Sequence, residues 1–269
     1  SYFSKQNKLI YKLKTMKNLL KVLILTVVLS SCSTDDSSSN QNGNLTDAKE
    51  LANVVQEGLY NLSFHYQNGK VTKVLHENYL RKHQIVYNSD GKVSRIYTEN
   101  IGTNHDNEDF EWDIIDTADY TENVYENGKL VAIMSGSNII NSFTYEGDLL
   151  VQEMNLNRIR TYTYNSDNEM THYILDETVN GGSIHMKLVE FDDKVNPFYK
   201  MWNEDKLKLP FHYGSFLSFY PHNLIRQVGA DDNEVDYISI YTSDEDGYPV
   251  SANATNWNGL GGSFFFEYN

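Results

Sequence analysis

The sequence predicts an all-β protein, an antiparallel meander of consecutive β-hairpin repeats that forms one large curved or partly rolled sheet. Two observations lead to this prediction. One turn signature recurs between strand-like runs along most of the chain, and the composition favours strands, with 20 tyrosines and 12 phenylalanines against four prolines. The repeat is interrupted near 192–229, where we expect an irregular, partly helical insert.

The repeated unit consists of an aromatic strand end, a turn rich in Asn, Asp and Gly, and an apolar strand start. Asn-Gly and Asp-Gly between strand-like runs are a strong hairpin signal, because these residues accept the positive φ angles of tight turns. The units span residues 64–71, 86–93, 124–130, 143–149, 162–170 and 240–250. Each unit therefore predicts one antiparallel hairpin.

The spacing of the units settles a local ambiguity near residue 51. Leu51, Val54 and Val55 have the spacing of a helix, but Leu51 precedes Tyr66 by the same fifteen residues that separate Leu130 from Tyr145. We therefore predict a strand over 51–57. Aromatic residues two apart along the strands would form a stripe on one face. The favoured interpretation is the buried face of the sheet, and a stacking platform for sugar rings is the alternative.

Two segments depart from the repeat. Residues 98–123 are polar and acidic and predict a loop with an extra strand. Residues 192–229 hold Pro197, Pro210 and Pro221, which are incompatible with central strands. Because an insert need not use its aromatic residues to pack the sheet, we predict ligand contacts there, with a plug at one end of the sheet as the alternative. The predicted ligand-binding residues are Trp202, His212, Tyr213, Phe216, Tyr220 and His222.

The N-terminus predicts an export signal and a lipid anchor. Residues 1–31 contain six lysines and no acidic residue, and the apolar stretch that follows Met16, the expected true start, is too short to span a bilayer. Leu29, Ser30, Ser31 and Cys32 resemble the bacterial lipobox, in which the cysteine is acylated and becomes the first mature residue. We expect a signal peptide with an upstream extension over 1–31, a lipidated flexible tether over 32–44, and one β-repeat domain over 45–269.

The acidic net charge and the absence of common catalytic motifs exclude several classes of function. The chain after residue 31 carries 37 acidic against 16 basic residues, which argues against nucleic acid as a partner. No P-loop, Gly-x-Ser-x-Gly elbow or His-Glu-x-x-His motif occurs, and Asp244, Asp246 and Gly247 lack the later glutamate of a calcium loop. We expect no cofactor, no metal site and no catalytic residues, and the sequence therefore predicts no enzymatic activity.

The repeat also carries a family resemblance. Its Tyr-x-x-x-Gly-Lys-Val units resemble the YD (Rhs-type) repeats of bacterial surface proteins. Together with the Phe191–Phe198 stretch, Asn223-Leu224-Ile225 and Asp246-Gly247-Tyr248-Pro249, they look like a group of uncharacterised Bacteroidota lipoproteins. That group is described as a domain of unknown function with a porin-like, all-antiparallel β fold. The resemblance implies a fold and an outer-membrane location but no activity. Asp35 and Asp36 after Cys32 resemble the surface-export signal of Bacteroidota lipoproteins, which would place the protein on the cell surface, with a periplasmic orientation as the alternative.

These observations favour a non-catalytic envelope lipoprotein that binds a glycan, a peptide or an envelope protein. Its contact with the membrane would be through the lipid on Cys32. The alternatives are a structural or assembly lipoprotein whose sheet edges contact other envelope proteins, and a hydrolase whose acidic residues the sequence does not single out.

Overall fold

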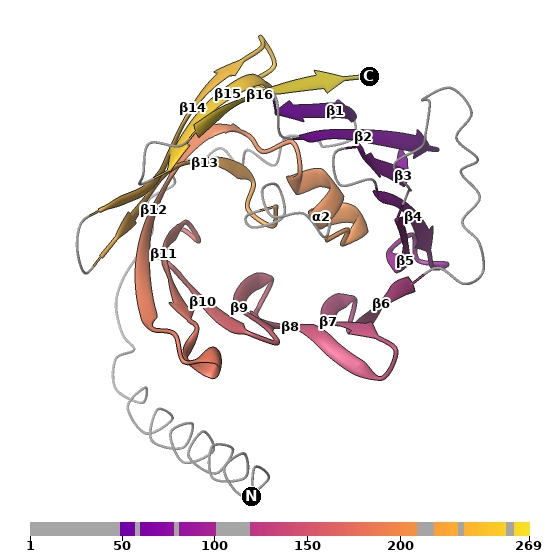
Figure 1. The fold of residues 1–269 in the computed structure, drawn as a ribbon, viewed down its shortest axis with the longest axis horizontal. Helices are drawn as coiled ribbons and strands as arrows, with labels where there is room; N and C mark the ends of the chain where they lie inside the picture. Colours follow the sequence, from indigo (N-terminus) through magenta and orange to yellow (C-terminus); the bar gives the residue numbers. More distant parts are fainter. Residues whose placement is uncertain are drawn as a thin grey trace, which may run out of the picture. The chain divides into compact units, whose positions relative to one another are not determined.

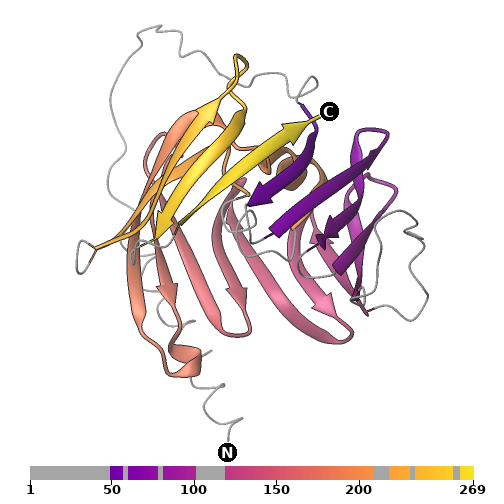
Figure 2. The same cartoon turned by 45° about the horizontal axis from the view of Figure 1, so that its top comes forward.

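The computed structural model describes residues 49–56, 60–77, 81–100, 119–208, 218–230, 234–256 and 261–269. In these residues sixteen antiparallel strands follow one another around a closed barrel (Figures 1 and 2). The first eight are β1 (Leu51–Gln56), β2 (Tyr60–Gln67), β3 (Lys70–His76), β4 (Arg81–Tyr87), β5 (Val93–Asn100), β6 (Asp119–Glu126), β7 (Lys129–Ser135) and β8 (Asn138–Glu146). The others are β9 (Leu149–Asn155), β10 (Arg158–Tyr164), β11 (Met170–Asp176), β12 (Ile184–Val195), β13 (His222–Gly229), β14 (Val235–Ser243), β15 (Pro249–Asn256) and β16 (Gly261–Tyr268).

The antiparallel, all-β prediction is confirmed, but the predicted open, curved or partly rolled sheet is wrong. The first and last strands pair with each other, with Val54 opposite Phe266 and Gln56 opposite Phe264. This pairing closes the meander into a barrel and leaves no free sheet edge at β1 or β16. Local repeats specify neighbouring strands, whereas closure depends on residues more than two hundred positions apart.

The predicted hairpin turns connect paired strands at one end of the barrel, which we call the turn end. Asn68 and Gly69 between β2 and β3 have φ angles of 53° and 75°, and Asn127 and Gly128 between β6 and β7 have 50° and 77°. Two successive positive φ angles are those of a type I′ turn, whose twist matches that of the flanking strands. The opposite end of the barrel, where β9 meets β10 and β11 meets β12, we call the mouth.

A β-bulge follows the turn in most units and determines which side chains face inward. In β8 and β9, Tyr145 pairs with Leu150 and Thr144 pairs with Gln152, so Val151 is the extra residue. Inward-facing residues after the turn are therefore three positions apart. Such pairs, all buried, are Leu51 and Val54, Val71 and Val74, Val93 and Ile96, Leu130 and Ile133, Leu150 and Glu153, Met170 and Tyr173, and Pro249 and Ala252.

Tyrosine hydroxyls join several hairpins to the strand that precedes them. The Tyr87 hydroxyl at the end of β4 donates to the Val71 carbonyl oxygen in β3 at 2.7 Å, and the Tyr125 hydroxyl in β6 donates to the Val93 carbonyl in β5 at 2.6 Å. We call this series the tyrosine ladder. Its other members are Tyr66 to Leu51, Tyr164 to Leu150 and Tyr268 to Pro249.

Turn lysines add a second connection along the same end. The Lys70 ammonium donates to the Gly91 carbonyl of the next turn at 2.7 Å and lies 5.0 Å from the centre of the Tyr87 ring. The Lys92 ammonium does the same to Gly128 and Tyr125, at 2.6 Å and 5.7 Å. The Gly-Lys and Tyr positions of the repeat thus meet between units rather than within one.

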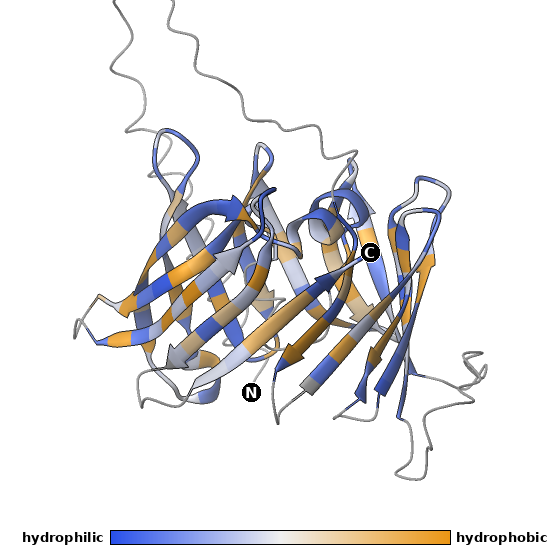
Figure 3. Ribbon diagram, turned by 90° about the horizontal axis from the view of Figure 1, so that it is seen from above, coloured by the Kyte–Doolittle hydropathy of each residue, from blue (hydrophilic) through white to orange (hydrophobic). Residues whose placement is uncertain are grey.

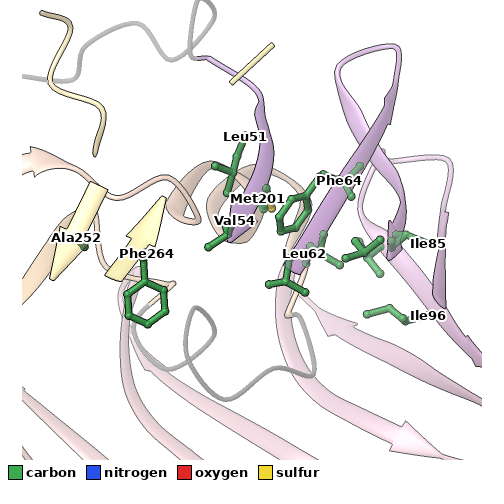
Figure 4. Close-up of a cluster of buried hydrophobic side chains, with 13 residues drawn as sticks. Leu51, Val54, Leu62, Phe64, Ile85, Ile96, Met201, Ala252 and Phe264 are labelled. Carbon is green, nitrogen blue, oxygen red and sulfur yellow. The ribbon is translucent and has the colours of Figure 1, made fainter. Parts of the chain in front are cut away.

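The described part of the insert between β12 and β13 (residues 196–208 and 218–221), which we call the plug, lies within the ring of strands (Figure 1). It contains α2 (Tyr199–Asp205), the only α-helix in the described part of the chain. Met201 and Trp202 of α2 are buried, and Met201 packs with Phe64 and other strand residues in the core (Figure 4). The described insert is shorter than predicted, because residues 192–195 and 222–229 belong to β12 and β13.

Hydrogen bonds hold the two ends of this plug together. The Asn196 backbone N–H donates to the Pro221 carbonyl at 2.9 Å, and its side-chain amide donates to the Tyr220 carbonyl at 3.0 Å. On the other side, the buried Asp205 carboxylate accepts a hydrogen bond from Lys70 of β3. The contact between Asp205 and Lys70 therefore attaches the plug to the wall.

The interior of the turn-end half of the barrel is apolar, and the outer face of the wall is largely polar. Blue and orange alternate along the strands of Figure 3 because successive side chains face opposite sides of the wall. Exposed polar pairs lie outward between β5 and β6 (Arg95–Glu122, 3.2 Å), between β12 and β13 (Arg226–Glu190, 2.6 Å), and between β1 and β16 (Asn53–Glu267, 2.8 Å). Exposed apolar side chains interrupt this polar surface on several strands: Ile184, Met186 and Leu188 on β12, Ile238 and Ile240 on β14, Val250 on β15 and Phe265 on β16.

Candidate functional site at the mouth of the barrel

A cleft of about 560 Å³ lies at the mouth, between the turn that joins β9 to β10 and the segment that joins β11 to β12. That segment contains the short 3₁₀ helix η3 (Thr178–Asn180). The volume lies within the range of sites for small ligands. Five of the eight lining residues are polar, three of them asparagines and two an ion pair: Ile140, Asn155, Leu156, Asn157, Arg158, Glu177, Asn180 and Gly182.

The strand register connects the cleft to the barrel interior. Arg158 of β10 is paired with Asn155 of β9, and one step further inward Arg160 is paired with Glu153. Residues two apart on a strand lie on the same face. Because Glu153 and Arg160 are mostly buried, a row of polar side chains runs from the lining of the cleft into the interior.

Glu153 is a departure from the repeat. Glu153 lies three residues after Leu150, the first buried residue that follows the turn. The residue at this position is buried and uncharged in every other unit described above, for example Val74, Ile96, Ile133 and Tyr173. Only 5% of Glu153 is exposed. A buried charge at a position that packs the core is costly unless it is paired, so this position is not explained by the fold alone.

Four side chains contact the Glu153 carboxylate. The Asn141 amide and the Tyr162 hydroxyl donate hydrogen bonds to it, each at 3.2 Å. The Lys208 ammonium contacts the same oxygen as Asn141, and the Arg160 guanidinium lies 3.7 Å from the other oxygen. The four donors come from β8, β10 and the plug, so Glu153 ties the plug to the wall near the mouth.

Within this cluster, the pKa of Lys208 departs strongly from its ordinary value. Burial lowers the pKa of its ammonium well below the ordinary value, because a charge in a dry interior loses its hydration. Its nitrogen also lies 5.1 Å from the centre of the Phe143 ring, and contact with that ring and with Glu153 favours the charged form. Two basic side chains, Arg160 and Lys208, thus share one carboxylate.

A second polar group continues around the wall. The Tyr173 hydroxyl donates to the Gln227 side chain at 2.9 Å, and Gln227 donates to Asp236 at 3.4 Å. Lys187 pairs with Asp236 at 2.9 Å. These contacts link β11, β12, β13 and β14, and they balance one cation against one carboxylate.

The structure places three of the six predicted ligand-binding residues. Trp202 and Tyr220 are buried in the plug, where the Trp202 ring lies 5.7 Å from that of Phe143 and the Tyr220 ring lies 4.0 Å from that of Phe191. His222 begins β13, and its Nδ1 atom lies 3.1 Å from the Lys194 carbonyl oxygen. His212, Tyr213 and Phe216 lie outside the described residues. Ligand binding by the six stays a prediction.

Sequence reasoning missed Glu153, Arg160 and the cleft. A signal existed for Glu153, because alignment of the repeats puts a carboxylate where the other units have uncharged, mostly apolar residues. It could be recognised only with the bulge in place, since simple alternation from Leu150 would turn Glu153 outward. Among the described residues, no group of three or more His, Cys, Asp or Glu side chains is arranged to hold a metal ion.

Comparisons with known proteins give structural similarities only. No family model and no curated protein matches the sequence. Porin-like proteins from Bacteroides uniformis and Bacteroides vulgatus are 12% and 11% identical, with TM-scores of 0.36 and 0.42. The alignments cover 81% and 82% of this chain and 96% and 99% of theirs. A Tc holotoxin pore of Photorhabdus luminescens matches 77% of this chain and 14% of its own, at 12% identity and a TM-score of 0.24.

Proposed function

We propose that this chain is an envelope lipoprotein whose plugged barrel stands outside the bilayer and binds a polar ligand, a glycan or a peptide, at its mouth. The observation that carries the binding proposal is Glu153. A buried carboxylate replaces a core residue of the repeat one residue pair inward from a cleft at the mouth, where two basic side chains and two neutral donors hold it in place.

The polarity of the wall supports a barrel that does not span the membrane. A barrel in lipid presents an apolar band outward and polar residues inward, and an outward charge near the bilayer midplane costs about 2–4 kcal/mol. Here exposed polar and charged pairs lie on the outer face in the middle of β1, β5 and β13, and the turn-end half of the interior is an apolar core. A barrel fold is compatible with an outer-membrane location, and an anchor on Cys32 would supply the attachment.

The chain direction supports an outward mouth. Residues 49 and 50 lead into β1 at the turn end, where the Lys49 ammonium pairs with Asp244 and Asp246, each at 2.7 Å. The Asn269 backbone N–H donates to the Glu50 carbonyl at 2.9 Å. A tether from Cys32 would therefore join the plugged end, which leaves the mouth at the far end of the barrel.

Two alternatives receive less support. A structural lipoprotein that works through free sheet edges fits poorly, because closure pairs β1 with β16. A hydrolase of the two-carboxylate type needs two acids about 5–10 Å apart that both reach the substrate. Glu153 is poorly suited to be one of them, because only 5% of it is exposed and Asn141, Arg160, Tyr162 and Lys208 contact its carboxylate.

The test has one arm for the anchor and one for the mouth. Metabolic labelling with an alkyne fatty acid should label the wild-type chain and leave Cys32→Ala unlabelled. An array of glycans and peptides should capture the wild-type protein, and Asn157→Ala in the cleft should weaken that capture at least tenfold. The control variant Arg95→Ala, on the outer wall, should leave the capture unchanged. Labelling of Cys32→Ala, or capture that Asn157→Ala leaves unchanged, would contradict the respective half of the proposal.

A further inference from the structure

The wall of the barrel is split between β13 and β14. In the described residues these two strands pair only over 226–228 on β13 and 235–238 on β14, toward the mouth. On the turn-end side, β14 continues to Ser243 in pairing with β15, and β13 begins at His222 in pairing with β12. The edges of β13 and β14 that face each other there therefore have no ladder partner.

A slot of about 490 Å³ occupies this split, between the end of β12, β13, β14 and the turn that follows β14. Ile240 in its lining is 69% exposed, so the slot opens on the outer face of the wall. Ser239 in its lining is buried and Tyr241 packs against the core, so the slot also extends into the wall. At the turn end, the Val195 backbone N–H donates to the Gly247 carbonyl at 3.3 Å and closes the gap there. The slot therefore fits a short segment only.

The free edge of β14 is a template for an added strand. Successive residues of a strand direct their N–H and C=O groups alternately to one neighbour and to the other. Alternate residues of 239–243 thus point these groups away from β15 and into the slot. Addition of an extended peptide to such an edge is a common mode of recognition, in which backbone hydrogen bonds supply affinity and side-chain contacts supply specificity. Ile225 and Ile240 in the lining offer apolar contacts to the side chains of such a peptide.

The lining of the slot is acidic. Three carboxylates, those of Asp192, Asp193 and Asp244, line it together with one ammonium group, that of Lys194. Lys194 pairs with Asp193 at 3.3 Å. The Asp192 carboxylate accepts hydrogen bonds from the Asn223 backbone N–H at 3.0 Å and from the Asn223 amide at 3.1 Å. These neutral donors stabilise the charge of Asp192 without cancelling it.

The surroundings of the slot keep this negative balance. Lys49 pairs with Asp244 and with Asp246, each at 2.7 Å, and the exposed Glu245 lies in the same turn. The ion pair between β12 and β13 on the outer wall is balanced in itself. The end of β12, the turn after β14 and Lys49 together carry five carboxylates against two ammonium groups. Positive charge on a guest would complement this excess.

We propose that the slot binds a short, extended, basic segment of another protein, which pairs with the edge of β14. An apolar side chain of the segment packs against Ile225 and Ile240, and a Lys or Arg side chain lies beside Asp193. The chain's own residues 32–48 do not suit the slot, because they contain three aspartates and no basic residue. The slot lies in the turn-end half of the wall, so this inference does not depend on ligand binding at the mouth.

The test uses a fluorescein-labelled peptide, Arg-Val-Thr-Val-Arg, titrated against the full chain in detergent and followed by fluorescence polarisation. Its acidic counterpart, Glu-Val-Thr-Val-Glu, is the control for charge. A version methylated on its backbone nitrogens keeps the side chains but lacks the ladder donors. The unmodified basic peptide should bind at least tenfold more tightly than either, because the first lacks complementary charge and the second cannot pair with β14.

Variants of the chain locate the binding. Asp193 is 85% exposed at its side chain, so substitution there should leave the fold intact. Asp193→Lys should weaken binding of the basic peptide at least tenfold and should strengthen binding of the acidic one. Ile240→Arg should also weaken binding of the basic peptide. The matched control is Asp148→Lys, because Asp148 is a fully exposed aspartate that also pairs with a lysine, in the turn after β8. It should leave both affinities unchanged.

Several results would overturn the inference. They are absence of binding by the basic peptide, binding that backbone methylation does not weaken, and equal weakening by Asp148→Lys and Asp193→Lys. Weakening by Asn157→Ala would place the peptide at the mouth, which would support the proposed function and overturn this inference. Competition by a peptide of residues 32–48 would assign the slot to the chain itself. The thermal unfolding midpoint of each variant is measured alongside. Should Asp193→Lys not fold, Asp193→Asn should still weaken binding of the basic peptide at least threefold, and an unchanged affinity would contradict the inference.

Discussion

The Tyr125 hydroxyl of β6 donates a 2.6 Å hydrogen bond to the Val93 carbonyl of β5, across the boundary between two hairpins. The two strands pair over only four residues, Arg95 to Thr98 in β5, all toward the mouth. The bond therefore closes the wall where the backbone ladder has ended. It gives Tyr125 a role at this strand end that phenylalanine could not fill, since phenylalanine has no hydroxyl to donate.

Removal of this hydroxyl should destabilise the barrel. We expect Tyr125→Phe to lower the free energy of unfolding by about 1 kcal/mol, the usual net contribution of a hydrogen bond. Urea denaturation followed by circular dichroism measures the change. Tyr120→Phe is the control, because Tyr120 lies outward and is 39% exposed, and it should change stability little. Equal effects for the two variants would show that the ladder does not hold the hairpins.

Truncation of the plug tests its role as core. Trp202 is 6% exposed and packs on Phe143 and Phe219, so Trp202→Ala should cost about 3–5 kcal/mol of unfolding free energy. Ile240→Ala, at an outward position that is 69% exposed, should cost less than about 0.5 kcal/mol. A Trp202→Ala barrel with an unchanged melting temperature would instead favour a binding role for Trp202.

Acid should destabilise the barrel through a buried histidine. Burial, with smaller contributions from His76 and Arg81, lowers the pKa of His83 from 6.5 to about 4. The unfolded chain then binds a proton that the folded chain excludes between these values, so stability is full above pH 6.5 and falls as the pH drops toward 4. The loss attributable to His83 is about 3 kcal/mol at most.

The measurement is a series of urea midpoints from pH 7.5 to pH 4. His83→Gln, which keeps a polar group near the Thr98 hydroxyl 2.9 Å away, should flatten part of that slope. Ile240→Ala, at an exposed position without a titrating group, should leave the slope as it is. A slope that His83→Gln does not alter would assign the acid sensitivity to other groups.

The hairpins were predictable because each depends on neighbouring residues. Asn-Gly at 68–69 and 127–128 specifies its own turn, and comparison with the other units correctly placed Leu51 and Val54 in a strand despite their helical spacing. The bulge explains that spacing. The buried aromatic stripe was also predictable, and Phe64, Phe143, Tyr162 and Phe264 lie in the core.

Barrel closure and the mouth were not predictable from local patterns. Closure depends on the pairing of Val54 with Phe266, and nothing near either residue specifies the other. The cluster at Glu153 needs Lys208 from the plug, 55 residues further along the chain. A unit-by-unit alignment exposes Glu153 as exceptional, but only the folded chain shows which cations surround it.

The claim that the barrel wall faces water, not lipid, has a direct test. Cys32 is the only cysteine, so single cysteines can be placed at Gln84 on β4 and Gln152 on β9, both outward by strand alternation. Reaction with a charged maleimide is measured in the full lipidated chain in vesicles. Rapid labelling at both positions, unchanged when the vesicles are dissolved in detergent, is the predicted result. Protection of both positions in vesicles, with labelling only after detergent is added, would show that the barrel spans the membrane and would contradict the account.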